Sequence, residues 1–355
     1  MFHVTSDNID DLMRAVFTRL LSGSRENNKV LSNKGRSTEV FGALLRLTNP
    51  RARLGRSVIR SRIYSSIGEL TWYLAASNEL SQIQHYIPAY HQFSDDDRTL
   101  NGAYGPRLFE SQRISENQSP NDEWQRVIDL LKDRRGSRNA VIQIYSNEDG
   151  KKNTKDIPCT CTIQFAIRRN KLEMHVHMRS NDVFLGLPHD IFSFTMMQEI
   201  AACELNVKMG SYHHSVASLH LYDDADEPNG VKPRTLAQLY LDEGLHDKVP
   251  MPPMPAGDPW PAIRELVRAE RDIREGKDYI APKCLDPYWC DLITLLHAHT
   301  IAVKSGSPEA LETLLATLNF EGYRLYILDR IAKRKQPSAV RDFFKGNADD
   351  ASRST

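Results

Sequence analysis

Two cysteines lie one residue apart in the segment 156–165, which reads DIPCTCTIQF. Pro158 and the pattern that follows it predict the start of a β-strand, and strand periodicity then places Cys159 and Cys161 on one face. Such a pair could bind a metal, form a redox pair, fill a core or supply one nucleophile. A C-x-C pair without a second pair of ligands is a weak metal signal, and a lone buried cysteine most often serves as a small apolar residue. The local sequence leaves these alternatives open.

A second group of polar residues follows in RSNDVFLGLPHDIFSFT, which reads as a short connection and the start of a helix. It holds more polar side chains than a connector needs. Farther on, the segment SLHLY places two more polar side chains on one strand face. The residues in these two segments that could do chemistry are Arg179, Ser180, Asp182, Gly186, Asp190, His220 and Tyr222.

Hydrophobic periodicity predicts the elements that must position these side chains. Residues 8–21 read as an amphipathic helix capped by Asn8, and SSIGELTWYLAAS reads as a helix that places Glu69 among large apolar residues. A helix that stops at Gly136 precedes a strand. The segments CTIQFAIRR and KLEMHVHMR form two strands joined by an RNK turn. A buried helix over FSFTMMQEIAACELN and strands around TEVFGALLRLTNP and HHSVASLHLY complete the pattern.

The chain changes character at the proline-rich segment 249–261, after which helix-forming residues dominate. We expect one domain over residues 1–250 and a mostly helical extension over residues 251–355.

Charge and cysteine usage narrow the class of protein. The 355 residues contain 46 Lys plus Arg and 46 Asp plus Glu, so the balance gives no reason to expect nucleic acid or a membrane surface as the main partner. Five cysteines at irregular spacing and an N-terminus with charges in place of an apolar run predict a reduced, cytoplasmic protein.

The motifs together resemble those of the thymidylate synthase family. The pair Pro158 and Cys159, the pair Gln164 and Phe165, and the segments RSND, LGLP and HLY occur in the family's order and spacing. The resemblance covers residues 8–250. It implies an α/β fold in which large mixed sheets of two subunits pack against each other across a homodimer interface, here with a C-terminal helical extension.

The resemblance also implies a chemistry. Cys159 matches the nucleophile that adds to C6 of the pyrimidine, which activates C5 toward a one-carbon unit from 5,10-methylenetetrahydrofolate. Glu69 matches the carboxylate that positions water and moves protons around the base. Cys161 is then structural.

Further residues match positions that bind the nucleoside monophosphate or the folate. Arg179 and Ser180 match phosphate ligands, because guanidinium groups suit phosphate oxygens, and Arg179 should also favour the Cys159 thiolate. Arg138 matches an arginine that reaches into the partner subunit's site. The remaining matches are Gln164, Tyr104, His220 and Tyr222 for the substrate, the last two at the sugar 3′-hydroxyl, and Asp182, Gly186 and Tyr90 for the folate.

The sequence departs from the family at Asp190, where thymidylate synthases have an asparagine that reads uracil. A protonated Asp190 could donate to N3 of cytosine and accept from its 4-amino group. The cytidylate and deoxycytidylate hydroxymethylases that the chain resembles also carry Asp there. Alternatively, Asp190 is a helix N-cap.

A second departure is Tyr90, which occupies the place of a tryptophan beside the reacting carbon, so that water could enter. Thr160 and Asn139 replace a histidine and a second arginine, and Lys34 or Arg36 is expected to substitute for an N-terminal phosphate-binding arginine. We therefore expect C5 hydroxymethylation of CMP or dCMP. The alternatives are a 5-methylase of dCMP or dUMP, which is thymidylate synthase activity in the latter case, and a non-catalytic nucleotide sensor.

Overall fold

The computed structural model describes residues 2–25, 27–32, 35–57, 59, 62–109, 122–151, 153–223, 231–244, 248–304 and 306–335. In these residues seven strands form one sheet with the order β1-β3-β7-β6-β5-β4, and β2 pairs with β3. The strands are β1 (Phe2–Ser6), β2 (Asn28–Ser32), β3 (Gly35–Leu47), β4 (Val141–Gln143), β5 (Thr160–Arg168), β6 (Lys171–Asp182) and β7 (Lys208–Tyr222). The pairs β1–β3 and β6–β7 are parallel and the others antiparallel. The expected large mixed sheet is confirmed.

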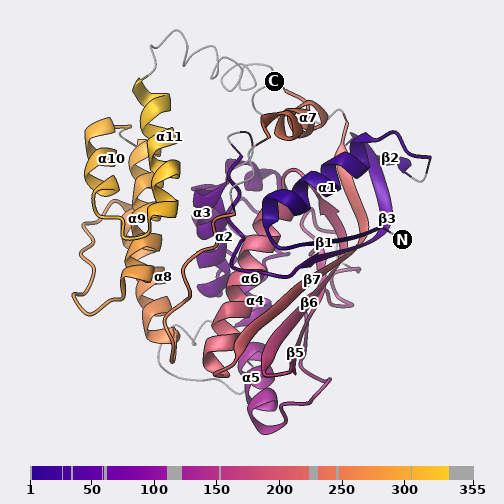
Figure 1. Ribbon diagram of the computed structural model, residues 1–355, viewed down its shortest axis with the longest axis horizontal. Helices are drawn as coiled ribbons and strands as arrows, with labels where there is room; N and C mark the ends of the chain where they lie inside the picture. Colours follow the sequence, from indigo (N-terminus) through magenta and orange to yellow (C-terminus); the bar gives the residue numbers. More distant parts are fainter. Residues whose placement is uncertain are drawn as a thin grey trace.

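Helices cover one face of this sheet (Figure 1). The helices of residues 9–133 are α1 (Ile9–Leu21), α2 (Ile63–Leu74), α3 (Leu80–Gln84), η1 (Pro88–Phe93), α4 (Gly105–Leu108) and α5 (Glu123–Asp133). Those of the rest of the chain are α6 (Leu187–Glu204), α7 (Pro233–Glu243), α8 (Trp260–Glu275), α9 (Pro287–Lys304), α10 (Pro308–Leu315), η3 (Glu321–Tyr323) and α11 (Arg324–Lys335).

Several predicted elements are confirmed by their local chemistry. Asn8 caps α1, and its Oδ1 accepts from the amide of Asp11 at 2.9 Å. Arg169 and Asn170, with φ of 51° and 58°, form the two-residue turn between β5 and β6, as expected for a tight hairpin. Helix α5 ends at Asp133, before the expected stop at Gly136. Helix α7 was not predicted.

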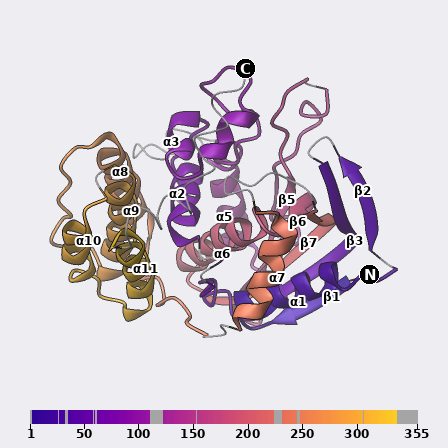
Figure 2. The ribbon, with the colours of Figure 1, turned by 90° about the horizontal axis from the view of Figure 1, so that it is seen from above.

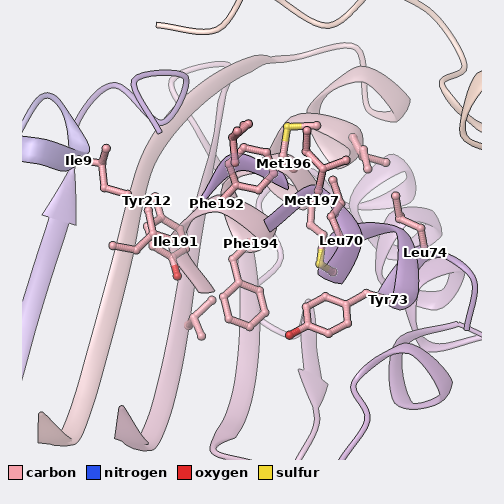
Figure 3. Packing of buried hydrophobic residues seen from close by; sticks show 14 of the residues in the cluster. Ile9, Leu70, Tyr73, Leu74, Ile191, Phe192, Phe194, Met196, Met197 and Tyr212 are labelled. Carbon is pink, nitrogen blue, oxygen red and sulfur yellow. The ribbon is translucent and has the colours of Figure 1, made fainter. Parts of the chain in front are cut away.

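Helix α6 is buried on all sides and joins the sheet to the other helices. It contacts β6 and β7 on one side and α2 on the other. Figure 3 shows Phe194 and Met197 of α6 facing Tyr73 and Leu70 of α2. Because every face is covered, the helix has no polar stripe. The buried side-chain amide of Gln198 is satisfied by donating to the carbonyls of Leu172 and Ser211 at 2.8 and 3.1 Å.

The C-terminal helices form a further layer on the side of α2 that faces away from the sheet (Figure 2). Helices α8 and α9 contact α2, and α10 and α11 contact α9. A buried ion pair joins Glu199 of α6 to Arg53, and the Met254 amide donates to Glu199 at 3.1 Å. Helices α8 and α9 of this layer therefore pack directly against α2, the helix that carries Glu69. The division of the chain at residue 250 stays a prediction.

The other face of the sheet carries polar side chains. On β6, Leu172, Met174 and Val176 are buried, whereas His175 and His177 on the opposite face are exposed. This is the face that the homodimer prediction assigns to a partner subunit. Among the described helices, none has the length and apolar character that a membrane crossing requires.

Candidate active site

Cys159 lies immediately before β5 and is half-buried. Its carbonyl accepts from the Arg179 amide at 2.9 Å, which ties it to β6. The pairing of β5 with β6 shifts register between Thr160 and Thr162. We expected Cys159 and Cys161 to share one face because we assumed a regular strand. The strand is irregular at this point, so its periodicity does not place the two side chains on one face. All five cysteines are free thiols.

The side chain of Arg179 holds the segment that leads to Cys159. Its Nε donates to the Pro158 carbonyl at 2.9 Å and one terminal nitrogen donates to the Ile157 carbonyl at 2.9 Å. On the other side of the cysteine, the Thr160 amide donates to the Tyr104 hydroxyl at 3.2 Å. The backbone on both sides of the candidate nucleophile is therefore held by side chains from other elements.

Glu69 lies on α2, buried, and faces Tyr90 of η1. The Tyr90 hydroxyl donates to Glu69 Oε1 at 2.6 Å. Burial raises the pKa of Glu69, and the hydrogen bond from Tyr90 opposes that rise because it stabilises the ionised form. Because burial raises the pKa of Glu69, its protonated form is more accessible than that of an exposed glutamate, which is a property that a general acid or base uses.

Asp190 is buried in the first turn of α6. The helix begins at Leu187 with Gly186 as its N-cap residue, so the alternative that Asp190 is an N-cap is wrong. Instead its Oδ2 accepts from Asn181 Nδ2 at 2.8 Å. Burial raises the pKa of Asp190 well above its ordinary value, and the nearby charge of Glu69 raises it further. Asp190 therefore favours the neutral, protonated form.

A chain of buried side chains continues from Asn181 into the core. Asn181 Oδ1 lies 3.1 Å from His214 Nε2, and His214 Nδ1 lies 2.7 Å from the Tyr212 hydroxyl. All three are at most 4% exposed. Sequence reasoning missed them, although Tyr212 and His214 occupy alternate positions of a strand, where apolar residues are expected on a covered face.

Asp182 has one carboxylate oxygen that is satisfied by backbone amides and one that is not. Oδ1 accepts from the amides of Phe184 and Leu185 at 2.7 and 2.9 Å. In the described part of the chain, the buried Oδ2 has no hydrogen-bond partner. An unpaired buried acceptor suits the N–H groups of a pterin ring, so the residue fits the folate that the family resemblance implies. Gly186 lies close by, where an added Cβ would come within 2.9 Å of Asn181 Nδ2.

The ends of β6 and β7 bring the remaining candidates together. Asp182 pairs with His220 in the sheet, and Ser180 pairs with Ser218. The rings of His220 and Tyr222 meet edge to face with centroids 5.0 Å apart. Burial raises the pKa of Tyr222, and the negative charges of Asp182 and Cys159 also contribute, which places Tyr222 in the same electrostatic environment as the cysteine.

Tyr104 links the cysteine to Asp190. Burial raises the pKa of Tyr104, and the nearby charges of Asp190 and Cys159 raise it further. Its ring stacks on Phe194 with centroids 6.2 Å apart. Cys159, Glu69, Asp190, Tyr90 and Tyr104 thus form one group from five separate segments, in which Glu69 and Asp190 are buried and the other three are half-buried.

Arg138 and Gln164 lie on the opposite, exposed side of β4 and β5. Gln164 Nε2 donates to the Arg138 carbonyl at 2.9 Å, and the Arg138 side chain is exposed. Their roles toward a substrate stay predictions. Lys34 lies outside the described residues, and Arg36 is at the start of β3, where its carbonyl accepts from the Asp223 amide at 2.8 Å.

A mixed sheet that holds a cysteine beside buried carboxyl groups, with a polar rim at the strand ends, defines an α/β protein with a candidate nucleophile. The family model "Thymidylate synthase" matches residues 11–239, which is more than half of the chain. The chain therefore belongs to the thymidylate synthase family, a family of one-carbon transferases, as the motifs led us to expect.

Relatives of the chain include three phage proteins named deoxyuridylate hydroxymethyltransferase. The protein of Bacillus phage SP01 is 30% identical over 220 residues, 59% of this chain and 57% of the relative. That of Delftia phage PhiW-14 is 26% identical over 62% of each chain. That of Pseudomonas phage M6 is 27% identical over 71% of this chain and 70% of the relative. The chain spans about three fifths of the length of the first two relatives.

A solved structure, the thermostable thymidylate synthase A from Bacillus subtilis, has the same fold. It matches with a TM-score of 0.52 at 17% identity, over 68% of this chain and 86% of that chain. The fold expected from the motifs is thus confirmed.

Proposed function

We propose that the protein is a folate-dependent pyrimidine nucleotide C5 hydroxymethylase that acts on CMP or dCMP. The observation that supports this base preference is the burial of Asp190, which raises its pKa and favours the neutral form; the residue stands where the family has an asparagine. A neutral carboxyl group offers one donor and one acceptor, and cytosine offers the complementary acceptor at N3 and donor at its amino group. Mismatched buried polar groups can discriminate between substrates by about 10⁴.

The proposed reaction begins when Cys159 Sγ forms a bond to C6 of the base, which makes C5 nucleophilic. Methylenetetrahydrofolate supplies the one-carbon unit, and Asp182 Oδ2 is the acceptor that would hold its pterin ring. C5 gains that carbon and loses its proton. The bond from that carbon to the folate nitrogen then breaks, which releases tetrahydrofolate and leaves an exocyclic methylene on C5. Water adds to this methylene, the bond to Sγ breaks, and the 5-hydroxymethyl nucleotide results. The Tyr90 hydroxyl and Glu69 together form a polar pair that can orient this water.

A release assay with nucleotides tritiated at C5 tests the proposal. Methylenetetrahydrofolate is added with dUMP, UMP, dCMP or CMP, and release from the cytidine nucleotides is expected. Cys159→Ala should abolish release, while Cys161→Ala, the matched control, should retain it. Release from uridine nucleotides alone would contradict the proposed base preference.

A second candidate, hydroxymethylation of dUMP, is favoured by the names of the three phage relatives. A neutral acid can also pair with uracil if its donor faces O4 and its acceptor faces N3–H. The product distinguishes the remaining alternatives. A 5-methyl nucleotide accompanied by dihydrofolate would identify the 5-methylase. Absence of release together with tight nucleotide binding would identify a sensor.

The homodimer and the role of Arg138 belong to the same proposal. We expect two copies to pair through the open face of the sheet, with Arg138 of each copy reaching the phosphate in the other copy's site. Mixing Arg138→Ala with Cys159→Ala tests this, because a mixed dimer contains one site with both residues intact. Recovery of activity is expected, and a monomer in sedimentation would overturn the expectation.

A further inference from the structure

Asp190 is the end of a hydrogen-bond chain that runs from the core to the proposed site. The chain passes from the Tyr212 hydroxyl to His214 Nδ1 at 2.7 Å, from His214 Nε2 to Asn181 Oδ1 at 3.1 Å, and from Asn181 Nδ2 to Asp190 Oδ2 at 2.8 Å. Tyr212 lies beneath α6 beside Ile191 (Figure 3). All four side chains are at most 8% exposed, so bulk water does not compete for these bonds.

Such a chain can point in one of two directions. In the first, Tyr212 donates to His214, His214 donates to Asn181 and Asn181 donates to Asp190 Oδ2. In the second, each bond reverses, and a protonated Asp190 donates its own proton to Asn181. The two directions leave different groups for the base, because the reversed chain removes the Asp190 proton from the site.

The far end of the chain decides between the directions. Among the residues that the structure describes, His214 is the one hydrogen-bond partner of the buried Tyr212 hydroxyl. If His214 donated to it, the Tyr212 proton would have no acceptor, and leaving a buried donor unsatisfied is unfavourable. Tyr212 must therefore donate. His214 is neutral, as this direction requires, because burial lowers its pKa to about 3.

The geometry points to Asn181 as a positioning residue that assigns the proton of Asp190 to Oδ1 and thereby sets which pyrimidine base the site accepts. With Oδ2 held as an acceptor by the Asn181 amide, the carboxyl group presents a donor at Oδ1 and an acceptor at Oδ2. It then no longer interchanges them. A freely exchanging carboxylic acid would pair with cytosine and with uracil, because it could match either pattern. This inference rests on the proposed contact between Asp190 and the base, but not on which base is preferred.

The test is the base selectivity of Asn181→Leu, a substitution of similar shape that removes the amide. The ratio of kcat/KM for dCMP to that for dUMP should move toward one by about tenfold, because the carboxyl proton can then occupy either oxygen. Gln198→Met is the matched control, because Gln198 is a buried amide of α6 that takes no part in the hydrogen bonds from Tyr212 to Asp190. Removing this amide should leave the ratio unchanged. Tyr212→Phe should shift the ratio in the same direction by less, because it removes the hydroxyl that excludes the reversed chain.

The outcome separates this inference from the proposed function. A wild-type preference for dUMP would refute the proposed base but not the role of Asn181, since the ratio of the variant should still approach one. Ratios of Kd for the two nucleotides, measured by calorimetry, give the same readout if Asn181→Leu binds but does not turn over. If Asn181→Leu does not fold, Tyr212→Phe carries the test. A ratio within about twofold of wild type in the folded variants would overturn the inference.

Discussion

The Tyr90 hydroxyl donates a hydrogen bond of 2.6 Å to Oε1 of the buried Glu69. The two side chains come from α2 and η1, and the ring of Tyr90 packs edge to face on Trp72 with centroids 5.8 Å apart. The hydrogen bond from Tyr90 stabilises the ionised form of Glu69.

Removing this contact should change the pH dependence of the enzyme. In Tyr90→Phe the ionised form of Glu69 loses a donor, so the pKa of Glu69 rises further. If Glu69 acts as a base, the acid-side limb of a kcat/KM profile moves to higher pH. Tyr279→Phe is the control, because Tyr279 donates to Glu265 at 2.7 Å in the C-terminal layer. An unchanged profile in Tyr90→Phe would show that Glu69 does not set this limb.

Asp190→Asn should redirect the base preference. The amide cannot supply a proton to N3 of cytosine, but it donates to O4 and accepts from N3–H of uracil. We expect the ratio of kcat/KM for dCMP to that for dUMP to fall by about 10³ or more. The wild-type enzyme should lose activity on dCMP as the pH rises through the raised pKa of Asp190, and this loss should be absent for dUMP with the variant. Equal ratios in both proteins would exclude a contact between Asp190 and the base.

Gly68→Ala should destabilise the fold around Glu69. A Cβ at this position would lie 2.2 Å from Cγ of Tyr86, whose hydroxyl donates to Glu270 of α8 at 3.0 Å. The ring is therefore confined between α2 and the C-terminal layer, and overpacking at such a place typically lowers the free energy of unfolding by about 1–3 kcal/mol. Urea unfolding of Gly68→Ala measures it, with Gly136→Ala as control, because an added Cβ there meets nothing within 4 Å. Equal midpoints would mean that Tyr86 moves freely.

The C-terminal layer should make the protein sensitive to acid. Burial lowers the pKa of His299 from 6.5 to about 3. The folded state therefore binds its proton less readily than the unfolded state, and the stability from His299 is complete above about pH 6.5 and is lost as the pH falls toward 3. His299 Nε2 donates to the His85 carbonyl, and its Nδ1 accepts from Arg330, each at 3.0 Å.

His299→Gln can reproduce one donor and one acceptor without titrating. Urea unfolding at a series of pH values from 7.5 down to 4.5 should show a weaker loss of stability for His299→Gln than for the wild type. His91→Gln changes an exposed histidine and should follow the wild-type curve. A wild-type slope in His299→Gln would show that this histidine is not neutral in the folded protein.

The sequence by itself determined the family and the elements that carry the motifs. The spacing of Pro158, Cys159 and the segments RSND and HLY depends only on residue order, and periodicity located α1, α2, α6 and the β5–β6 hairpin to within a few residues. The departure at Asp190 was also visible, because a single substitution in a known pattern needs no coordinates. The roles that the motifs assign to individual residues stay predictions.

The tertiary structure decided what surrounds those residues. Three contacts could not be predicted from the sequence. The Tyr90 hydroxyl donates to Glu69, and Arg179 holds the backbone before Cys159. Tyr212 and His214 are connected to Asp190 through Asn181. These partners lie on different elements, and their polar groups meet only because packing of α2, α6 and the sheet excludes water. The burial that raises the pKa of Asp190 arises from the same packing. The sequence identifies the residue at position 190 as an acid, and the burial that raises its pKa depends on the tertiary structure.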